Sequence, residues 1–204
     1  MSIATDAAVT AKGRQTRGRI VQAAAELILS KGVTATTIDE ICAAADVGKS
    51  QIYHYFADKS AVVRGVIELQ TERVLGCHEP VFERMNSWDD WQAWRDWIVS
   101  AQSSVGFRWG CPLGSLANEL ADSDDLARRM IDSSFERWER GFRLALGRMV
   151  DANVLKPEAD LVGLSTFLLS SLQGGLLLSE ARKDAAPLRR ALDSALAYVR
   201  TFAV

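Results

Sequence analysis

The stretch GRIVQAAAELILSKGVTATTIDEICAAADVGKSQIYHYFADKSAVV, residues 18–63, decides the fold of the first third of this chain. Its apolar residues recur at helical spacing, and the pair Lys31-Gly32 (a basic residue, then a glycine) marks the end of a first helix. Thr37 and Glu40 have the spacing of a capping box, which predicts that a second, short helix begins there. We expect a third short helix from Gly48, and a fourth from Asp58 to about residue 75.

Gly48, Lys49 and Ser50 form a triplet that also occurs in nucleotide-binding loops. A phosphate-binding loop of that kind needs a further glycine five positions before Gly48, where this chain has Ala43. It must also follow a β-strand, whereas residues 41–45 are typical of a helix. The triplet therefore does not indicate a nucleotide hydrolase.

Two short helices, over about 37–44 and 48–54 and joined by residues 45–47, match the plan of a helix-turn-helix over about 36–56. Val47 and Ile52 are expected to pack against Ile38 and Ile41. Gly48 would cap the third helix, and its first exposed turn would hold Lys49, Ser50 and Gln51, with Tyr53, His54 and Tyr55 able to bind phosphates. The alternative is an ordinary helical hairpin whose Gly-Lys-Ser segment is a solvated cap.

Residues 18–63 resemble the amino-terminal domain of the TetR family of bacterial transcriptional repressors, from the Gly-x-x-x-Thr-Thr-x-x-x-Ile segment to the closing Tyr-x-Tyr-Phe-x-x-Lys. The chain departs from that family's pattern at Asp46, where a turn glycine is common, and at Gly48, where serine is common. The resemblance implies phosphate contacts by Arg14, Arg17, Thr36 and Thr37, base contacts by Lys49, Ser50 and Gln51, and a phosphate clamp of Tyr53, His54 and Lys59. His54 could instead be a surface residue without a DNA contact.

Composition is compatible with a protein of this class without pointing to it. The chain has 204 residues, 48% hydrophobic residues and a formal charge of −2, and four basic residues without an acid lie between Lys12 and Arg19. The hydrophobic segment of a secretory signal is absent, and three scattered cysteines do not suggest disulfides, so we expect a cytoplasmic protein. Residues 161–178 carry no charge, but their Ser, Thr and Gln residues favour a buried helix over a membrane span.

The sequence predicts an all-α fold of roughly nine helices, because runs of alternating β-branched residues are nearly absent. Each of the four prolines, Pro80, Pro112, Pro157 and Pro187, is expected at a helix start or in a link between helices. The expected organisation is a flexible tail over 1–12, a DNA-binding domain over 13–60 and, as the resemblance implies, a ligand-binding and dimerisation domain over 61–204.

Aromatic residues on two long helices suggest a cavity for a small apolar or aromatic effector. Trp91 and Trp94 would face inward from the first helix, and Phe135, Trp138 and Phe142 from the second, although these side chains could simply fill the core. The segment GCPLGSLANEL, residues 110–120, resembles the start of a helix that borders the effector cavity in one subgroup of the family. The full predicted lining is Trp91, Trp94, Trp109, Cys111, Phe135, Trp138, Phe142 and Leu172.

The last two predicted helices carry leucine stripes that suggest a four-helix interface between two copies of the chain, as in the resembled family. Its predicted residues are Leu161, Leu168, Leu172, Leu176, Leu188, Leu192, Leu196 and Val199. Neither a catalytic pattern nor a metal-ligand pattern is visible, so we expect no enzyme activity, no metal and no cofactor. A homodimeric, ligand-released repressor on a pseudo-palindromic double-stranded operator is the leading hypothesis; a helical small-molecule-binding protein without DNA-binding activity is the alternative.

Overall fold

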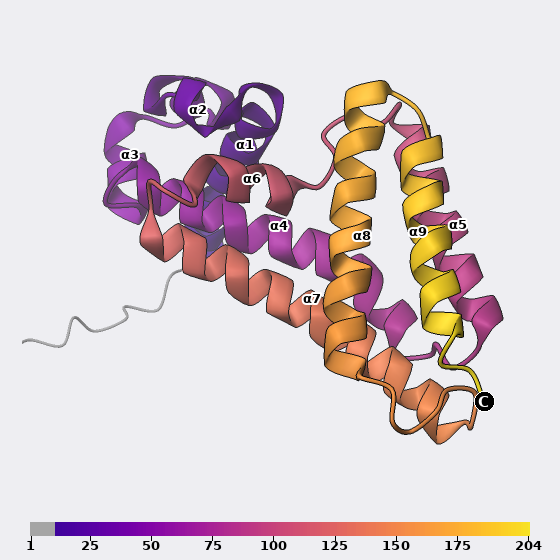
Figure 1. Cartoon of the computed structure of the whole chain (residues 1–204). Coiled ribbons are helices and arrows are strands. Elements are labelled where there is room, and N and C mark those ends of the chain that lie inside the picture. The colour runs from indigo at the N-terminus through magenta and orange to yellow at the C-terminus, as the bar shows by residue number, and fades with distance from the viewer. Residues whose placement is uncertain (1–10) are drawn as a thin grey trace, which may run out of the picture.

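The computed structural model describes residues 11–204, which form nine α-helices and contain no β-strand, as the sequence predicts (Figure 1). Residues 1–10 of the expected tail lie outside the described part of the chain, and the first helix already begins at Ala11. The helices are α1 (Ala11–Ala35), α2 (Ile38–Ala45), α3 (Lys49–Tyr55), α4 (Lys59–Phe82), α5 (Trp88–Ser104), α6 (Pro112–Leu120), α7 (Asp125–Asp151), α8 (Leu161–Arg182) and α9 (Ala186–Arg200).

Helices α1 to α3 form the predicted helix-turn-helix unit. The regular part of α1 ends at Gly32, whose φ of 84° is a conformation that residues with a side chain rarely adopt. Asp46 supplies the left-handed turn between α2 and α3, with a φ of 50°. Ile41 and Ile52 are enclosed in the core of this unit, while Ile38 and Val47 lie half-buried at its edge.

Helix α4 connects this unit to the rest of the molecule and is one to two turns longer than predicted. It continues past residue 75 because Phe82 anchors its last turn in the carboxy-terminal core, where its exposed fraction is only 2%. Pro80 therefore lies inside α4, and its assignment to a helix start or link is wrong. Pro112 and Pro187 do lie in the first turns of α6 and α9, and Pro157 lies in the link before α8.

The described part of the molecule has two hydrophobic cores, one in its amino-terminal part and one in its carboxy-terminal part. The carboxy-terminal core joins α4, α5, α7, α8 and α9, and Figure 1 shows α8 and α9 side by side at the end of the molecule away from α2 and α3. The amino-terminal core contains α1 to α4 together with Leu116 and Leu120 of α6 and Ile131 of α7. Helix α6 therefore packs directly on the unit that carries the helix-turn-helix.

Helix α8 is the one described helix that is long and apolar enough to cross a membrane. A core helix of a soluble protein has the same composition, and Leu168 and Leu172 of α8 are completely enclosed by neighbouring helices. Packing within the protein thus accounts for the apolar inner face of residues 161–178, while Val162, Phe167, Leu177 and Leu178 on the other face are exposed.

Candidate DNA-binding surface and effector cavity

The start of α2 is held by the capping box that the sequence predicts. Thr37 Oγ1 accepts a hydrogen bond of 3.3 Å from the backbone N–H of Glu40, and Glu40 Oε2 accepts one of 2.9 Å from the N–H of Thr37. Hydrogen bonding from Lys31, with that from Thr37, lowers the pKa of Glu40 to about 2. Glu40 is thus ionised at any physiological pH, and it joins the end of α1 to the start of α2.

Helix α3 presents a polar surface next to this cap. Gly48 is its N-cap residue, and Gln51 Oε1 accepts a hydrogen bond of 3.3 Å from the N–H of Gly48. Lys49, Ser50 and Gln51 are all exposed in the first turn. Tyr53 has 54% of its surface exposed and His54 is exposed beside it, whereas Tyr55 is half-buried against the amino-terminal core. The exposed face of α3 therefore carries the predicted contacts except Tyr55.

Lys49 has a partner that the sequence reading did not identify. Its Nζ lies 2.7 Å from Oδ1 of Asp39 on α2, and hydrogen bonding to that carboxylate raises the pKa of Lys49. Both side chains are more than half exposed, so the pair is screened by salt and worth little in stability. The sequence does contain a signal for this pair: Asp39 lies in the first turn of α2, and Lys49 lies in the first turn of α3, the next helix.

Two residues assigned to phosphate contacts have structural roles. Thr36 is completely buried, and its Oγ1 donates a 2.8 Å hydrogen bond to the carbonyl of Gly32, so the prediction that it contacts DNA is wrong. Lys59 is half-buried, and its Nζ donates a 2.6 Å hydrogen bond to the carbonyl of Val33. Both side chains satisfy carbonyl groups at the kinked end of α1, where the helix can no longer pair its own backbone.

The basic start of α1 lies on the same unit. Arg14 and Arg17 are exposed, and the guanidinium of Arg17 lies 5.2 Å from the centre of the Phe56 ring and 3.5 Å from Glu68. Phe56 directly follows α3, so Arg17 is held close to the end of that helix. The surface thus combines basic side chains from α1 with polar and aromatic ones from α3.

The predicted effector lining is divided among several places in the structure. Trp91, Trp94 and Phe142 are fully buried and pack on one another, with ring centres 5.3 to 5.9 Å apart, so they fill the core rather than wall a cavity together. Phe135 lines a hollow between α6 and α8, and Trp109 lines a cavity beside α1. The prediction of one site made by all eight residues is therefore wrong.

Cys111, Trp138 and Leu172 do line one common cavity of about 230 Å³ between α4, α5, α7 and α8. Its wall also includes His78 and Trp97, which the sequence reading did not assign to the effector site. We call this space between the four helices the effector cavity. Its mostly apolar wall with a few polar groups is typical of a small-molecule site.

His78 brings a buried imidazole to the wall of the effector cavity. Trp94 Nε1 donates a 3.2 Å hydrogen bond to His78 Nδ1, and burial lowers the pKa of His78 to about 4, so at neutral pH its proton is on Nε2. Within residues 11–204, Nε1 of Trp138 is the one enclosed side-chain donor or acceptor without a hydrogen-bond partner. Burial also raises the pKa of the Cys111 thiol, which therefore stays protonated. The Nε2–H of His78 is thus a donor in the wall of this cavity and favours a ligand with a hydrogen-bond acceptor.

The leucine stripes predicted for the dimer interface face the interior of a single chain. Leu168, Leu172, Leu188 and Leu192 are completely buried in the carboxy-terminal core, Leu176, Leu196 and Val199 are nearly so, and Leu161 packs against the same core. The assignment of the seven buried residues to an interface is wrong because α8 and α9 use them to pack on each other and on α4, α5 and α7, whereas the half-buried Leu161 stays a prediction. The large apolar side chains that α8 and α9 leave exposed are Val162, Phe167, Leu177, Leu178 and Tyr198.

Comparisons with known proteins bear on both units. Residues 20–66 match the family described as bacterial regulatory proteins, tetR family, and residues 89–194 match the domain described as transcriptional regulator LmrA/YxaF-like, C-terminal domain. An HTH-type transcriptional regulator in the lacX 3′ region of Lactococcus lactis is 27% identical over 180 residues, covering 84% of this chain and 86% of that protein. The HTH-type transcriptional repressor DhaR of a Mycobacterium species is 22% identical with the same coverage.

Solved structures share the fold. A TetR-family regulator from Cytophaga hutchinsonii superimposes with a TM-score of 0.83 at 19% identity, over 96% of this chain and 98% of that one. The reduced form of NemR from Escherichia coli superimposes with a TM-score of 0.80 at 22% identity, over 93% and 98% of the two chains.

Proposed function

The chain belongs to the TetR family of bacterial transcriptional regulators and carries that family's DNA-binding helix-turn-helix, and from this premise we propose that it is a homodimeric repressor released from its operator by a small apolar effector. The observation that carries the DNA-binding part is the exposed face of α3, where Lys49, Gln51 and Tyr53 point away from a well-formed core. One such helix per subunit would read one half-site of a pseudo-palindrome from the major groove.

Base reading is assigned to Lys49, Ser50 and Gln51. An amide side chain suits adenine and an ammonium suits guanine. Lys49 must leave Asp39 to reach DNA, and phosphate or base acceptors compensate for that loss when it does. Arg14, Arg17, Thr37, Tyr53 and His54 are the proposed backbone contacts, since all of them are exposed on the same unit.

A dimer is proposed through the outer faces of α8 and α9. Along α8 the exposed positions from Gly163 to Leu178 include no charged residue. Phe167 and Tyr198 form an edge-to-face pair with ring centres 5.2 Å apart, which joins the two helices into one apolar surface. An uncharged surface that carries large exposed apolar side chains is typical of an interaction site. One relative, DhaR, is named a transcriptional repressor, which makes repression the favoured direction of control.

The proposed effector is a small, flat, apolar molecule with one or two hydrogen-bond acceptors, such as a carbonyl group. The Nε2–H of His78 supports this choice, because it lies in the wall of the cavity without a described hydrogen-bond partner and a ligand acceptor would pair with it. Cys111 and Leu172 would supply apolar contact. Binding would favour a dimer whose two α3 helices no longer match the half-site spacing, a coupling of a few kcal/mol.

The test begins with selection of bound sequences from a random duplex pool at near-physiological salt, where non-specific phosphate binding is weak. One inverted repeat should be enriched, and the double variant Lys49→Ala/Tyr53→Ala should lose at least 100-fold in affinity for it while remaining a dimer. Lys156→Ala is the matched control, because Lys156 is exposed in the link between α7 and α8, outside the helix-turn-helix unit. A folded dimer that enriches no sequence would instead support a helical ligand-binding protein that does not read DNA.

A further inference from the structure

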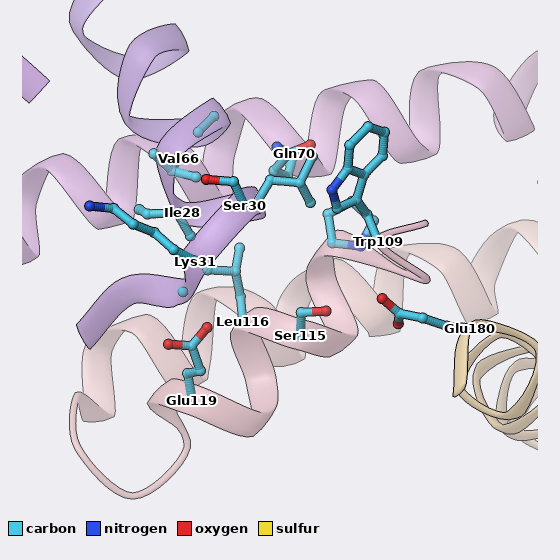
Figure 2. Close-up of a pocket in the computed structure, with 14 residues that line it drawn as sticks. Ile28, Ser30, Lys31, Val66, Gln70, Trp109, Ser115, Leu116, Glu119 and Glu180 are labelled. Carbon is cyan, nitrogen blue, oxygen red and sulfur yellow. The ribbon is translucent and has the colours of Figure 1, made fainter. Parts of the chain in front are cut away.

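A second cavity lies where the amino-terminal unit meets α6, and it shares only Pro112 with the effector cavity (Figure 2). It encloses about 220 Å³ and is walled by the end of α1, by Val66 and Gln70 of α4, by Trp109, by α6 and by Glu180 of α8. The cavity is thus bounded by both units of the protein. We call it the junction cavity.

Gln70 brings a buried polar group to this cavity. Only 6% of the residue is exposed, and its side-chain amide forms no hydrogen bond with any described residue. The amide is nevertheless not sealed in the core. Among residues 11–204, Nε1 of Trp138 is the one side-chain nitrogen or oxygen that is both fully enclosed and without a hydrogen-bond partner, so the unpaired amide of Gln70 is not fully enclosed. The small accessible area of Gln70 must therefore include its amide, which opens into the junction cavity. A buried amide in that position has unused hydrogen-bonding capacity.

Two carboxylates face the same space. Glu180 is half-buried and has neither an ion pair nor a side-chain hydrogen bond within residues 11–204. Figure 2 shows its carboxylate directed from α8 toward the loop that carries Trp109. Glu119 Oε2 accepts a 2.7 Å hydrogen bond from the N–H of Val33. The lysine in the wall, Lys31, is paired with Glu40 outside the cavity. The junction cavity therefore has two negative charges that no cation of the wall balances.

Trp109 supplies an aromatic face. Its φ of 69° is unusual for a residue with a side chain, and the loop around it is tied down by Lys183, whose Nζ donates a 3.0 Å hydrogen bond to the carbonyl of Phe107. The indole remains 41% exposed instead of packing into either core. A left-handed backbone in a non-glycine residue is strained and persists only where the surroundings impose it. An exposed indole in the wall of a cavity that also carries two carboxylates is well suited to bind a cation.

We propose that the junction cavity binds a small organic cation of the amidinium or guanidinium class. Its charge would pair with Glu180, its flat surface would lie on the Trp109 indole, and an N–H group would be accepted by the Gln70 amide oxygen. Glu119 adds a second negative charge to the wall. A planar cation is favoured over a simple ammonium because it can form two parallel hydrogen bonds with one carboxylate.

Benzamidine and benzamide are the probes, because they share a shape and differ in charge. Calorimetric titration should give at least tenfold tighter binding of benzamidine than of benzamide to the full-length protein. Glu180→Gln should reduce benzamidine affinity about tenfold and remove that preference. Glu136→Gln is the matched control: it deletes the same charge from an exposed position on α7 and should leave both affinities unchanged.

The position of the probe is checked independently by the indole N–H resonance of Trp109, assigned with Trp109→Phe. Benzamidine should shift that resonance in the wild-type protein and in Glu136→Gln. Equal affinity for the two probes, insensitivity to Glu180→Gln, or a shift confined to Trp138 would overturn the proposal, the last by locating the probe in the effector cavity. No DNA is present in this test, so its outcome is separate from that of the proposed operator binding.

Discussion

His78 shows how one buried side chain can tie stability to pH. Its folded-state pKa of about 4 lies below the ordinary value of 6.5, because burial disfavours the charged imidazolium. The contribution of neutral His78 to the free energy of unfolding is present in full above pH 6.5. It is lost as the pH falls from 6.5 through 4, because over that range the unfolded chain binds a proton at His78 and the folded protein does not. Between pH 6.5 and 5 this loss amounts to about 2 kcal/mol.

His78→Asn should flatten that dependence. Asparagine can still accept the hydrogen bond from Trp94 Nε1, but it does not titrate. The measurement is the free energy of unfolding by urea at pH 7 and pH 5, and the variant should lose about 2 kcal/mol less than the wild type on acidification. His54→Asn, a change at the exposed histidine, should lose as much as the wild type. Parallel losses in all three proteins would contradict the assigned role of His78.

At the scale of elements, the end of α1 depends on contacts from three other segments. Gly32 adopts a φ of 84°, Thr36 and Lys59 satisfy the carbonyls of Gly32 and Val33, and Glu119 of α6 accepts the N–H of Val33. A Cβ at Gly32 would lie 2.9 Å from Glu119 Oε2. This kink is therefore the point where α6 holds the DNA-binding unit, so a shift of α6 would be transmitted there.

Gly32→Ala should destabilise the protein by about 2 kcal/mol, because the backbone conformation at this position is nearly exclusive to glycine and the added methyl group displaces Glu119. Gly18→Ala is the contrasting variant. Gly18 lies inside regular α1 with no atom near its missing side chain, so that alanine should stabilise by about 0.5 to 1 kcal/mol. Thermal unfolding of both variants measures the difference, and equal melting temperatures would rule out the strain at the kink.

At the scale of the whole molecule, the proposed dimer depends on the outer face of α8. Leu177 is 58% exposed there, and a second copy would bury it. Leu177→Glu should therefore convert the dimer to a folded monomer, because burying an unpaired carboxylate costs several kcal/mol. Sedimentation velocity gives the mass of the species. Leu144→Glu, at a similarly exposed leucine of α7, should leave the dimer intact; a dimer in both variants would place the interface elsewhere.

Local patterns in the sequence determined the helical elements of this protein. Helical spacing, the Thr37–Glu40 box and the Lys31-Gly32 end depend on neighbours within four residues, so the all-α class and the helix-turn-helix follow from the sequence, with α2 and α3 displaced by a single residue. The exposed face of α3 follows from the same periodicity, because Ile52 must turn inward.

Only the tertiary structure decided which apolar face meets which neighbour. Periodicity identifies an apolar stripe without identifying its partner, so the leucines of α8 and α9 suggested an interface although they pack inside one chain. The same limit applies to Trp91 and Phe142, which fill the core. It applies also to His78 and Trp138, which come from helices distant in sequence and pack on each other in the wall of the effector cavity, with ring centres 4.7 Å apart. Long-range packing places these side chains, and local spacing contains no information about it.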